Sequence, residues 1–151
     1  SRTFAISSEL VGTGIDHTAI SQNIQEVTLA QAKLQNMALD TLELDPSGAA
    51  MIMITAADLA KYHINFEQAK AAVSTPGRLK EVMTWVTFTE KPDGTYRVSY
   101  RSKGPVINTL AQKHDGGGHD LASGANAQDL KEVQEIFQEL IAVTKKYKGE
   151  K

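Results

Sequence analysis

The feature that most constrains how this chain folds is a pair of strand-like segments, residues 82–89 and 96–102, separated by Lys91-Pro92-Asp93-Gly94. Both segments are rich in β-branched and aromatic residues, which favour extended backbone. A short connection of Pro, Asp and Gly between two such segments is typical of a β-hairpin. We therefore expect a β-sheet that contains this hairpin.

A second pair of strands is predicted upstream. Residues 42–44 and 49–54 flank the turn Asp45-Pro46-Ser47-Gly48, which has the composition of a tight reversal. The run 49–54 is apolar at every position, as in a strand that is buried on both faces. This second hairpin predicts that the sheet has at least one fully covered strand.

Helical patterns surround the strands. We expect helices over residues 2–11, from Asp16 through Ile24, over 28–39, after Thr55 or Asp58, over 65–73, over 105–113, and from Asp129 onward. The last helix carries one apolar stripe, formed by Leu130, Val133, Phe137, Leu140, Ile141 and Tyr147. These elements predict an α/β domain, a mixed β-sheet flanked by helices, preceded by an N-terminal helical linker or remnant.

Composition narrows the classes of function. The 151 residues carry a net charge of −2 and include no cysteine, which excludes disulfides, thiolate nucleophiles and cysteine-bound zinc. Residues 76–119 hold seven Lys and Arg against four Asp and Glu, so an anionic ligand is expected there. No apolar run reaches the roughly 18–20 residues of a membrane span, and no secretory leader opens the chain, so we expect a cytoplasmic protein.

The strand 96–102 supplies the first candidate contacts for an anion. Alternation places Arg97, Ser99 and Arg101 on one face of the strand and the apolar residues between them on the other. A guanidinium can hold a phosphate at two points, and a neighbouring hydroxyl adds a donor. The alternative is an ordinary solvated strand face.

The run Gly116-Gly117-Gly118, followed by His119, supplies the second group of candidate contacts for an anion. Glycine permits positive φ and lets backbone N–H groups approach a ligand, and a helix that starts after the run would add favourable partial charge. His119 would donate a hydrogen bond to a phosphate oxygen, and the small residues 122–125 would pack beneath the loop. The alternatives are a flexible turn and a histidine that caps a helix or faces solvent.

No complete catalytic or metal-binding set can be read from the other residues. His17 and His63 lack partners at ligand spacing, and His114 is expected at the exposed end of a helix. An HExxH motif, a paired His-Asp cluster and a Ser/His/Asp arrangement are all missing. We therefore assign no catalytic residue and no metal ligand to this chain.

Over residues 96–125 the chain resembles the DHH-associated domain, the C-terminal domain of the DHH phosphoesterases. The family pattern is a strand ending in Ser-x-Arg-Ser, a helix with an early Val/Ile-Asn, a loop closing with Gly-Gly-Gly-His, and a tail of small residues. The matching residues are Ser99, Arg101, Ser102, Ile107, Asn108, Gly116, Gly117, Gly118, His119 and the run 122–125. The resemblance extends over residues 40–147. The run Arg-Ser-Lys-Gly-Pro-Val-Ile-Asn favours the branch that degrades short oligoribonucleotides and dephosphorylates adenosine 3',5'-bisphosphate.

The resemblance implies a domain organisation. Residues 1–26 resemble the end of a catalytic DHH domain, 27–40 a linker helix, and 41–151 the substrate-binding domain. In this family the catalytic domain carries two manganese ions. The chain itself is therefore expected to bind no cofactor and to hydrolyse nothing, whereas its parent is a metal-dependent phosphoesterase. The expected partners are short single-stranded RNA or a nucleotide bisphosphate, the DHH domain and a second copy of the chain, with no membrane.

The resemblance also implies roles for single residues. The expected contacts to phosphate are Arg101, Ser99, Lys103, Asn108, Gly116, Gly117, Gly118 and His119. Arg101 would hold the phosphate or the terminal nucleotide, with help from Ser99 and Lys103, and Asn108 would contact the ligand or orient the loop. Asp115 stands where the family often has a fourth glycine. Because a carboxylate would repel phosphate, we expect it to face solvent.

Three other readings remain open at this point. The parent could be a phosphodiesterase of cyclic dinucleotides, which an assay of both substrate classes would distinguish. The chain could be a stand-alone nucleotide-binding module, or a plain interaction domain in which the glycines form only a turn.

Overall fold

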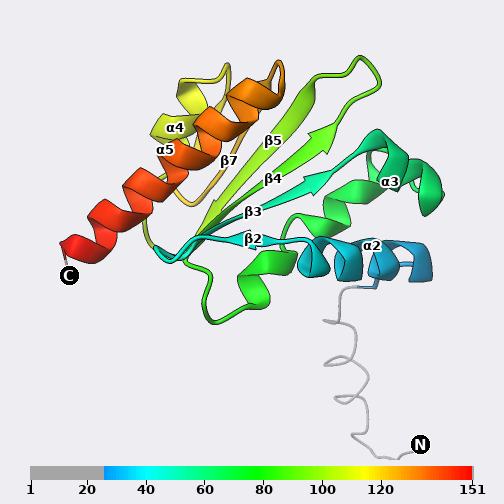
Figure 1. Cartoon of the computed structure of the whole chain (residues 1–151), viewed down its shortest axis with the longest axis horizontal. Helices are drawn as coiled ribbons and strands as arrows, with labels where there is room; N and C mark the ends of the chain where they lie inside the picture. Colours follow the sequence, from blue (N-terminus) through cyan, green and yellow to red (C-terminus); the bar gives the residue numbers. More distant parts are fainter. Residues whose placement is uncertain (1–25, 151) are drawn as a thin grey trace, which may run out of the picture.

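The computed structural model describes residues 26–150, which form one six-stranded mixed sheet with helices on both faces (Figure 1). The strand order is β2-β3-β4-β5-β7-β6, and neighbouring strands are antiparallel except for β3 and β4. This is the predicted fold class. The helices expected within residues 2–24 lie outside the described residues.

The first described helix, α2 (Leu29–Asp40), begins at a capping box. The Thr28 side chain accepts a hydrogen bond from the Gln31 N–H at 3.0 Å, and the Gln31 side chain accepts one from the Thr28 N–H at 2.9 Å. The helix buries Leu34 and Ala38 against the sheet and the crossover that follows. The helix expected over residues 28–39 is confirmed.

The first strands and the crossover follow the predicted order. Strands β2 (Glu43–Leu44) and β3 (Ala49–Ile54) pair through a turn in which Gly48 has a φ of +99°. A crossover of α3 (Ala56–Lys61) and two 3₁₀ helices, η1 (Gln68–Ala72) and η2 (Thr75–Arg78), leads to β4 (Thr84–Glu90), parallel to β3. Thr55 caps α3. The helix expected over residues 65–73 is the shorter η1.

The central hairpin forms as predicted. Strand β4 pairs with β5 (Tyr96–Ser102) along its whole length. In the turn, Gly94 has a φ of +86° and donates its N–H to the Lys91 carbonyl oxygen at 2.9 Å. The Asp93 carboxylate accepts hydrogen bonds from the backbone and hydroxyl of Thr95, so the turn is stabilised by its own side chains.

The C-terminal part differs from the sequence-based expectation in two ways. Helix α4 spans only Asn108–Gln112, and the Ile107 N–H just before it donates to the Asp120 carbonyl oxygen at 2.8 Å. The glycine run forms strand β6 (Gly117–His119), and the small residues form β7 (Ala122–Ala127). No helix begins directly after the glycines, so the expected contribution of a helix start to anion binding is wrong.

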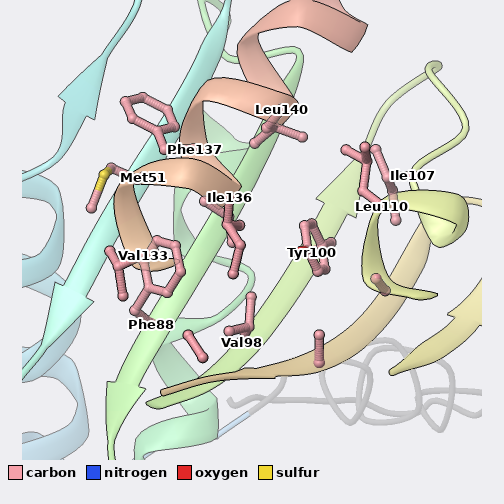
Figure 2. Close-up of a cluster of buried hydrophobic side chains, with 14 of the residues drawn as sticks. Met51, Phe88, Val98, Tyr100, Ile107, Leu110, Val133, Ile136, Phe137 and Leu140 are labelled. Carbon is pink, nitrogen blue, oxygen red and sulfur yellow. The ribbon is translucent and has the colours of Figure 1, made fainter. Parts of the chain in front are cut away.

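Helix α5 (Leu130–Gly149) covers one face of the sheet (Figure 1). Asp129 caps it, accepting the Glu132 N–H at 2.9 Å, as predicted. Its buried residues pack against inward-facing side chains of the sheet (Figure 2). The helix contributes Val133, Ile136, Phe137 and Leu140, and strands β3, β4 and β5 contribute Met51, Phe88, Val98 and Tyr100. Leu130, expected in the stripe, is instead 60% exposed, since it lies at the first position of the helix.

The opposite face of the sheet is covered unevenly. Two apolar clusters, one around Leu34 and Ile54 and one around Ala50 and Trp85, join α2 and the crossover to β3 and β4. On β5, β7 and β6 the same face carries residues that are half-buried or exposed, including Arg97, Ser99, Arg101, Ala122, Gly124 and His119. We call this part of the sheet the open face. Within residues 26–150, no helix combines the length and apolar character needed to cross a membrane.

Candidate functional site

Strand β5 divides its side chains between the core and the open face. Tyr96, Val98 and Tyr100 are buried under α5, whereas Arg97 is exposed and Ser99 and Arg101 are half-buried. This is the predicted alternation. The strand therefore presents two guanidinium groups and a hydroxyl without removing any side chain from the core.

Arg101 and His119 lie in one row across the open face. Ala122 on β7 is the register partner of Arg101 on β5 and also of His119 on β6. Side chains directly opposite each other in a sheet point to the same side. Two strand spacings separate the Cα atoms of Arg101 and His119 by about 10 Å. An arginine side chain can span much of that distance, so a small ligand on the open face can contact both residues.

Small residues form the floor between these side chains. Ala122 lies between Arg101 and His119, and in the next row Gly124 lies between Ser99 and Gly117. A Cβ on Gly124 would lie 3.2 Å from Nη2 of Arg97, so this guanidinium extends over the glycine. The row of small residues leaves room for a ligand on the sheet surface.

The three positions of the glycine run differ in whether the structure requires glycine there. A Cβ on Gly116 would overlap the Gly124 carbonyl oxygen and lie 2.6 Å from the Cα of Ala125, so only glycine fits there. Gly118 has a φ of +146°, which disfavours other residues. A Cβ on Gly117 would meet nothing within 4 Å, and its φ is not positive. Local packing therefore explains Gly116 and Gly118 but not Gly117.

The backbone of β6 offers donors in a different form from the one expected. Because β6 is the last strand of the sheet, alternate N–H groups point away from β7. The sequence predicted a concave turn of successive N–H groups. The structure has a short edge strand instead, with His119 at its end.

Arg101 is held in place but keeps donors to offer. Its Nη1 donates to the Tyr100 carbonyl oxygen at 2.8 Å, which fixes the side chain against its own strand. Burial lowers the pKa of Arg101, and the nearby positive charge of Arg97 lowers it further. A negatively charged ligand on the open face would relieve this repulsion. The open face is thus electrostatically suited to a negatively charged ligand.

Two residues expected at the site, Lys103 and Asn108, make no contact with the described residues that would place them in this row. Lys103 is exposed, and its Nζ donates to the Leu79 carbonyl oxygen at 2.9 Å. Asn108 begins α4, whose buried residues pack in the core on the other side of the sheet. Its Oδ1 is buried with no hydrogen-bond partner among the described residues. Asp115 is exposed, as expected.

A pocket of about 260 Å³ lies at the edge of the open face, between β5 and the crossover. Its described lining residues are Phe66, Lys70, Val73, Thr89, Arg97, Ser99 and Arg101. Sequence reasoning placed Arg97 on this strand face but did not assign it to the site, and it missed Phe66 and Lys70 entirely. No local signal marks those two residues. Only the parallel crossover brings them beside β5.

His114 is not at an exposed helix end, contrary to the expectation. It is 8% exposed, and its ring nitrogens lie 2.6 Å from Oε2 of Glu132 and 2.8 Å from Oε1 of Glu139, both on α5. Burial alone would lower the pKa of His114, but the two carboxylates outweigh burial and raise it. The carbonyl oxygen of His114 accepts the Asn126 N–H at 3.0 Å. The residue thus ties α5 to the segment that leads into β6.

Comparison with known proteins places the chain in a family. The DHHA1 domain family matches residues 31–146. The probable bifunctional oligoribonuclease and PAP phosphatase NrnA of Streptococcus mutans is 43% identical over 140 residues, which cover 93% of this chain and 45% of that protein. The bifunctional oligoribonuclease and PAP phosphatase NrnA of Bacillus subtilis is 34% identical over 146 residues, covering 97% of this chain and 46% of that protein. The chain thus spans less than half the length of these relatives.

Solved structures show the same fold. An exopolyphosphatase-related protein from Bacteroides fragilis superposes with a TM-score of 0.74 at 22% identity, covering 89% of this chain and 42% of that one. A pGpG-specific phosphodiesterase from Vibrio cholerae gives a TM-score of 0.53 at 11% identity, covering 76% of this chain and 38% of that one. At these identities the likeness concerns the fold alone. The family resemblance stated from the sequence is confirmed.

Proposed function

The chain belongs to the DHHA1 domain family, and from that premise we propose that it is the substrate-binding domain of a phosphoesterase that acts on short oligoribonucleotides and on adenosine 3',5'-bisphosphate. The substrates in the proposal are those named for the relatives from Streptococcus mutans and Bacillus subtilis. In it, the open face holds a phosphate group of the substrate, and a catalytic DHH domain carries out the hydrolysis.

The observation that carries the proposal is the row Arg101, Ala122 and His119 across β5, β7 and β6. Arg101 and His119 belong to the same row of the open face, with the small residue Ala122 between them, on the part of the sheet that the described helices do not bury. Charge-assisted hydrogen bonds from guanidinium to phosphate are stronger than neutral ones and have fixed geometry. Arg101 is therefore assigned the phosphate grip, with Ser99 beside it.

Gly117 supports the same location for the ligand. Neither its φ nor its surroundings require a glycine, because a Cβ would meet no atom within 4 Å. A glycine in such a place is explained if a ligand approaches the backbone closely. In the proposal, the His119 side chain donates to the phosphate from the side opposite Arg101, and the outward N–H groups of β6 contact the part of the ligand that extends past the edge of the sheet.

The catalytic metal is assigned to another part of the protein. Among residues 26–150 no group of three or more His, Asp or Glu side chains is placed so as to hold a metal ion. In the proposal, the manganese ions implied by the family are held by the DHH domain. What these residues do in the proposal is bind the substrate and orient its phosphate, which speeds a reaction by restricting the geometry of approach.

Isothermal titration calorimetry tests the proposal. The full chain is titrated with adenosine 3',5'-bisphosphate, the dinucleotide pApA and pGpG. Arg101→Gln is expected to weaken binding of the first two ligands about 10- to 150-fold, since a hydrogen bond to a charged group contributes about 1.5–3 kcal/mol. Arg78→Gln is the matched control, because Arg78 is exposed and does not line the pocket.

The outcomes separate the competing functions. Unchanged affinity in Arg101→Gln would remove this residue from the site. A clear preference for pGpG over the adenosine ligands would favour the alternative function in cyclic-dinucleotide breakdown, since pGpG is the linear product of such a dinucleotide. If no nucleotide binds, the nucleotide-binding role itself is wrong and a plain interaction domain becomes the better reading.

A further inference from the structure

The pocket between β5 and the crossover contains more positive charge than one phosphate grip needs. Arg97, Arg101 and Lys70 all line it, and none of its described lining residues is acidic. Arg97 and Arg101 make no ion pair with the described residues, and the positive charge of Arg97 lowers the pKa of Arg101. Such an arrangement is stabilised by a ligand that brings more than one negative charge.

Arg97 has the position and the freedom to bind a ligand group of its own. Arg97 lies four residues before Arg101 on the same strand face, so their Cα atoms are about 13 Å apart along β5. Its side chain is exposed, extends over Gly124, and makes no hydrogen bond with the described residues. The guanidinium donors of Arg97 thus remain available on the sheet surface.

Lys70 approaches the same pocket from the crossover. It pairs with Glu67 at 2.8 Å, but both side chains are strongly exposed, at 64% and 72%. An ion pair in such an exposed position is weak and is readily exchanged for a ligand. Phe66 and Val73 complete the wall of the pocket on this side. Two segments far apart in sequence therefore contribute cations to one hollow.

We infer that Arg97 and Lys70 form a second phosphate subsite next to the one at Arg101, so that the domain binds ligands with two phosphate groups one nucleoside apart. The substrate class is the nucleoside bisphosphate and the 5'-phosphorylated dinucleotide. This inference rests on the proposed function, since it takes the first phosphate to be held at Arg101. Arg97 then determines specificity, because it distinguishes ligands with two phosphates from ligands with one.

Calorimetry with two probes tests the inference on the full chain. Adenosine 5'-monophosphate and adenosine 3',5'-bisphosphate are titrated into the original chain and into Arg97→Gln, Lys70→Gln, Arg101→Gln and Arg78→Gln. The original chain is expected to bind the bisphosphate at least 10-fold more tightly than the monophosphate. Arg97→Gln should abolish most of this difference while leaving the affinity for monophosphate within about 2-fold. Lys70→Gln should reduce the difference by a smaller factor, and Arg78→Gln should leave it unchanged.

Salt dependence gives a second readout that a purely structural effect would not move. The logarithm of the affinity for bisphosphate should fall with the logarithm of salt concentration less steeply in Arg97→Gln, with a slope smaller by about 1. Circular dichroism of each variant shows that the fold is retained.

The possible results separate this inference from the function on which it rests. If Arg97→Gln weakens both probes equally, or neither, the second subsite is refuted while the grip at Arg101 stands. If Arg101→Gln weakens neither probe, or the original chain binds neither, the proposed function fails and the inference fails with it. A loss confined to the bisphosphate in Arg97→Gln supports both.

Discussion

Substitution of the neighbouring glycines 116 and 117 by alanine should change stability in opposite directions. In Gly117→Ala the new methyl group meets nothing within 4 Å and the backbone φ is compatible with alanine. Replacing glycine in a strand then restricts the unfolded chain and stabilises the fold by about 0.4–1 kcal/mol. For a chain of this size that raises the melting temperature by about 1–4 °C.

In Gly116→Ala the methyl group overlaps the Gly124 carbonyl oxygen and the backbone of Ala125. These atoms belong to the paired strand β7 and cannot rotate away, so the strands must shift apart. Overpacking of this kind costs about 1–3 kcal/mol. The expected melting temperature is lower than that of the original chain by about 2–12 °C.

Thermal unfolding followed by circular dichroism measures both changes, and calorimetry with adenosine 3',5'-bisphosphate measures binding in Gly117→Ala. If the ligand approaches the backbone of β6, the stabilised Gly117→Ala variant binds at least 5-fold more weakly. Equal destabilisation by the two substitutions would contradict the geometry of β6. Full affinity in Gly117→Ala would show that the ligand does not approach this strand.

Two further predictions concern the titration of His114 and the absence of hydrolysis. Because the pKa of His114 is raised in the folded state, its contribution to stability is complete below the unfolded value of about 6.5 and is lost as the pH rises through the higher folded value. The loss of stability caused by His114→Gln, measured by thermal unfolding, should therefore be larger at pH 6 than at pH 9. An equal loss at both pH values would contradict the ion pairs assigned to His114. The chain alone, with or without manganese, should not hydrolyse pApA or adenosine 3',5'-bisphosphate, since its described residues include no donor set for a metal. Chromatography of the products measures this. Hydrolysis by a highly purified sample would refute the assignment of catalysis to another domain.

Local sequence signals predicted the elements whose determinants are close in the chain. The hairpin of β4 and β5 follows from strand residues on either side of Pro92, Asp93 and Gly94, and its turn is stabilised by bonds within four residues. The start of α5 follows from Asp129 and the N–H three residues later. In each case the favourable conformation is fixed by neighbours in sequence, so the pattern is visible without the fold.

The features that sequence reasoning missed depend on distant partners. The glycine run looks like a loop by composition, but pairing with β7 makes it a strand. His114 looks exposed because its two carboxylate partners are 18 and 25 residues away. Phe66 and Lys70 join the candidate site only through the parallel crossover between β3 and β4. Long-range pairing decides these positions, and single-sequence patterns do not report it.

The candidate site could be predicted in part for the same reason. Arg101, Ser99 and His119 fall on one face because strand alternation and register together place them there. Alternation is readable from the sequence, whereas register is not. Asn108 and Lys103 match the family pattern in sequence, yet in the structure Lys103 contacts the Leu79 carbonyl and Asn108 begins α4. Their assignment to ligand binding remains a prediction.

Strand β5 separates the side chains of the core from those of the open face. Its even-numbered residues, Tyr96, Val98 and Tyr100, lie in the core, while residues 97, 99 and 101 belong to the open face. If the open face binds the substrate as proposed, substitutions at these three positions alter ligand preference without disturbing the packing under α5. A single strand of seven residues thus offers three adjustable positions on a fixed support, so relatives could diverge in substrate while sharing one scaffold.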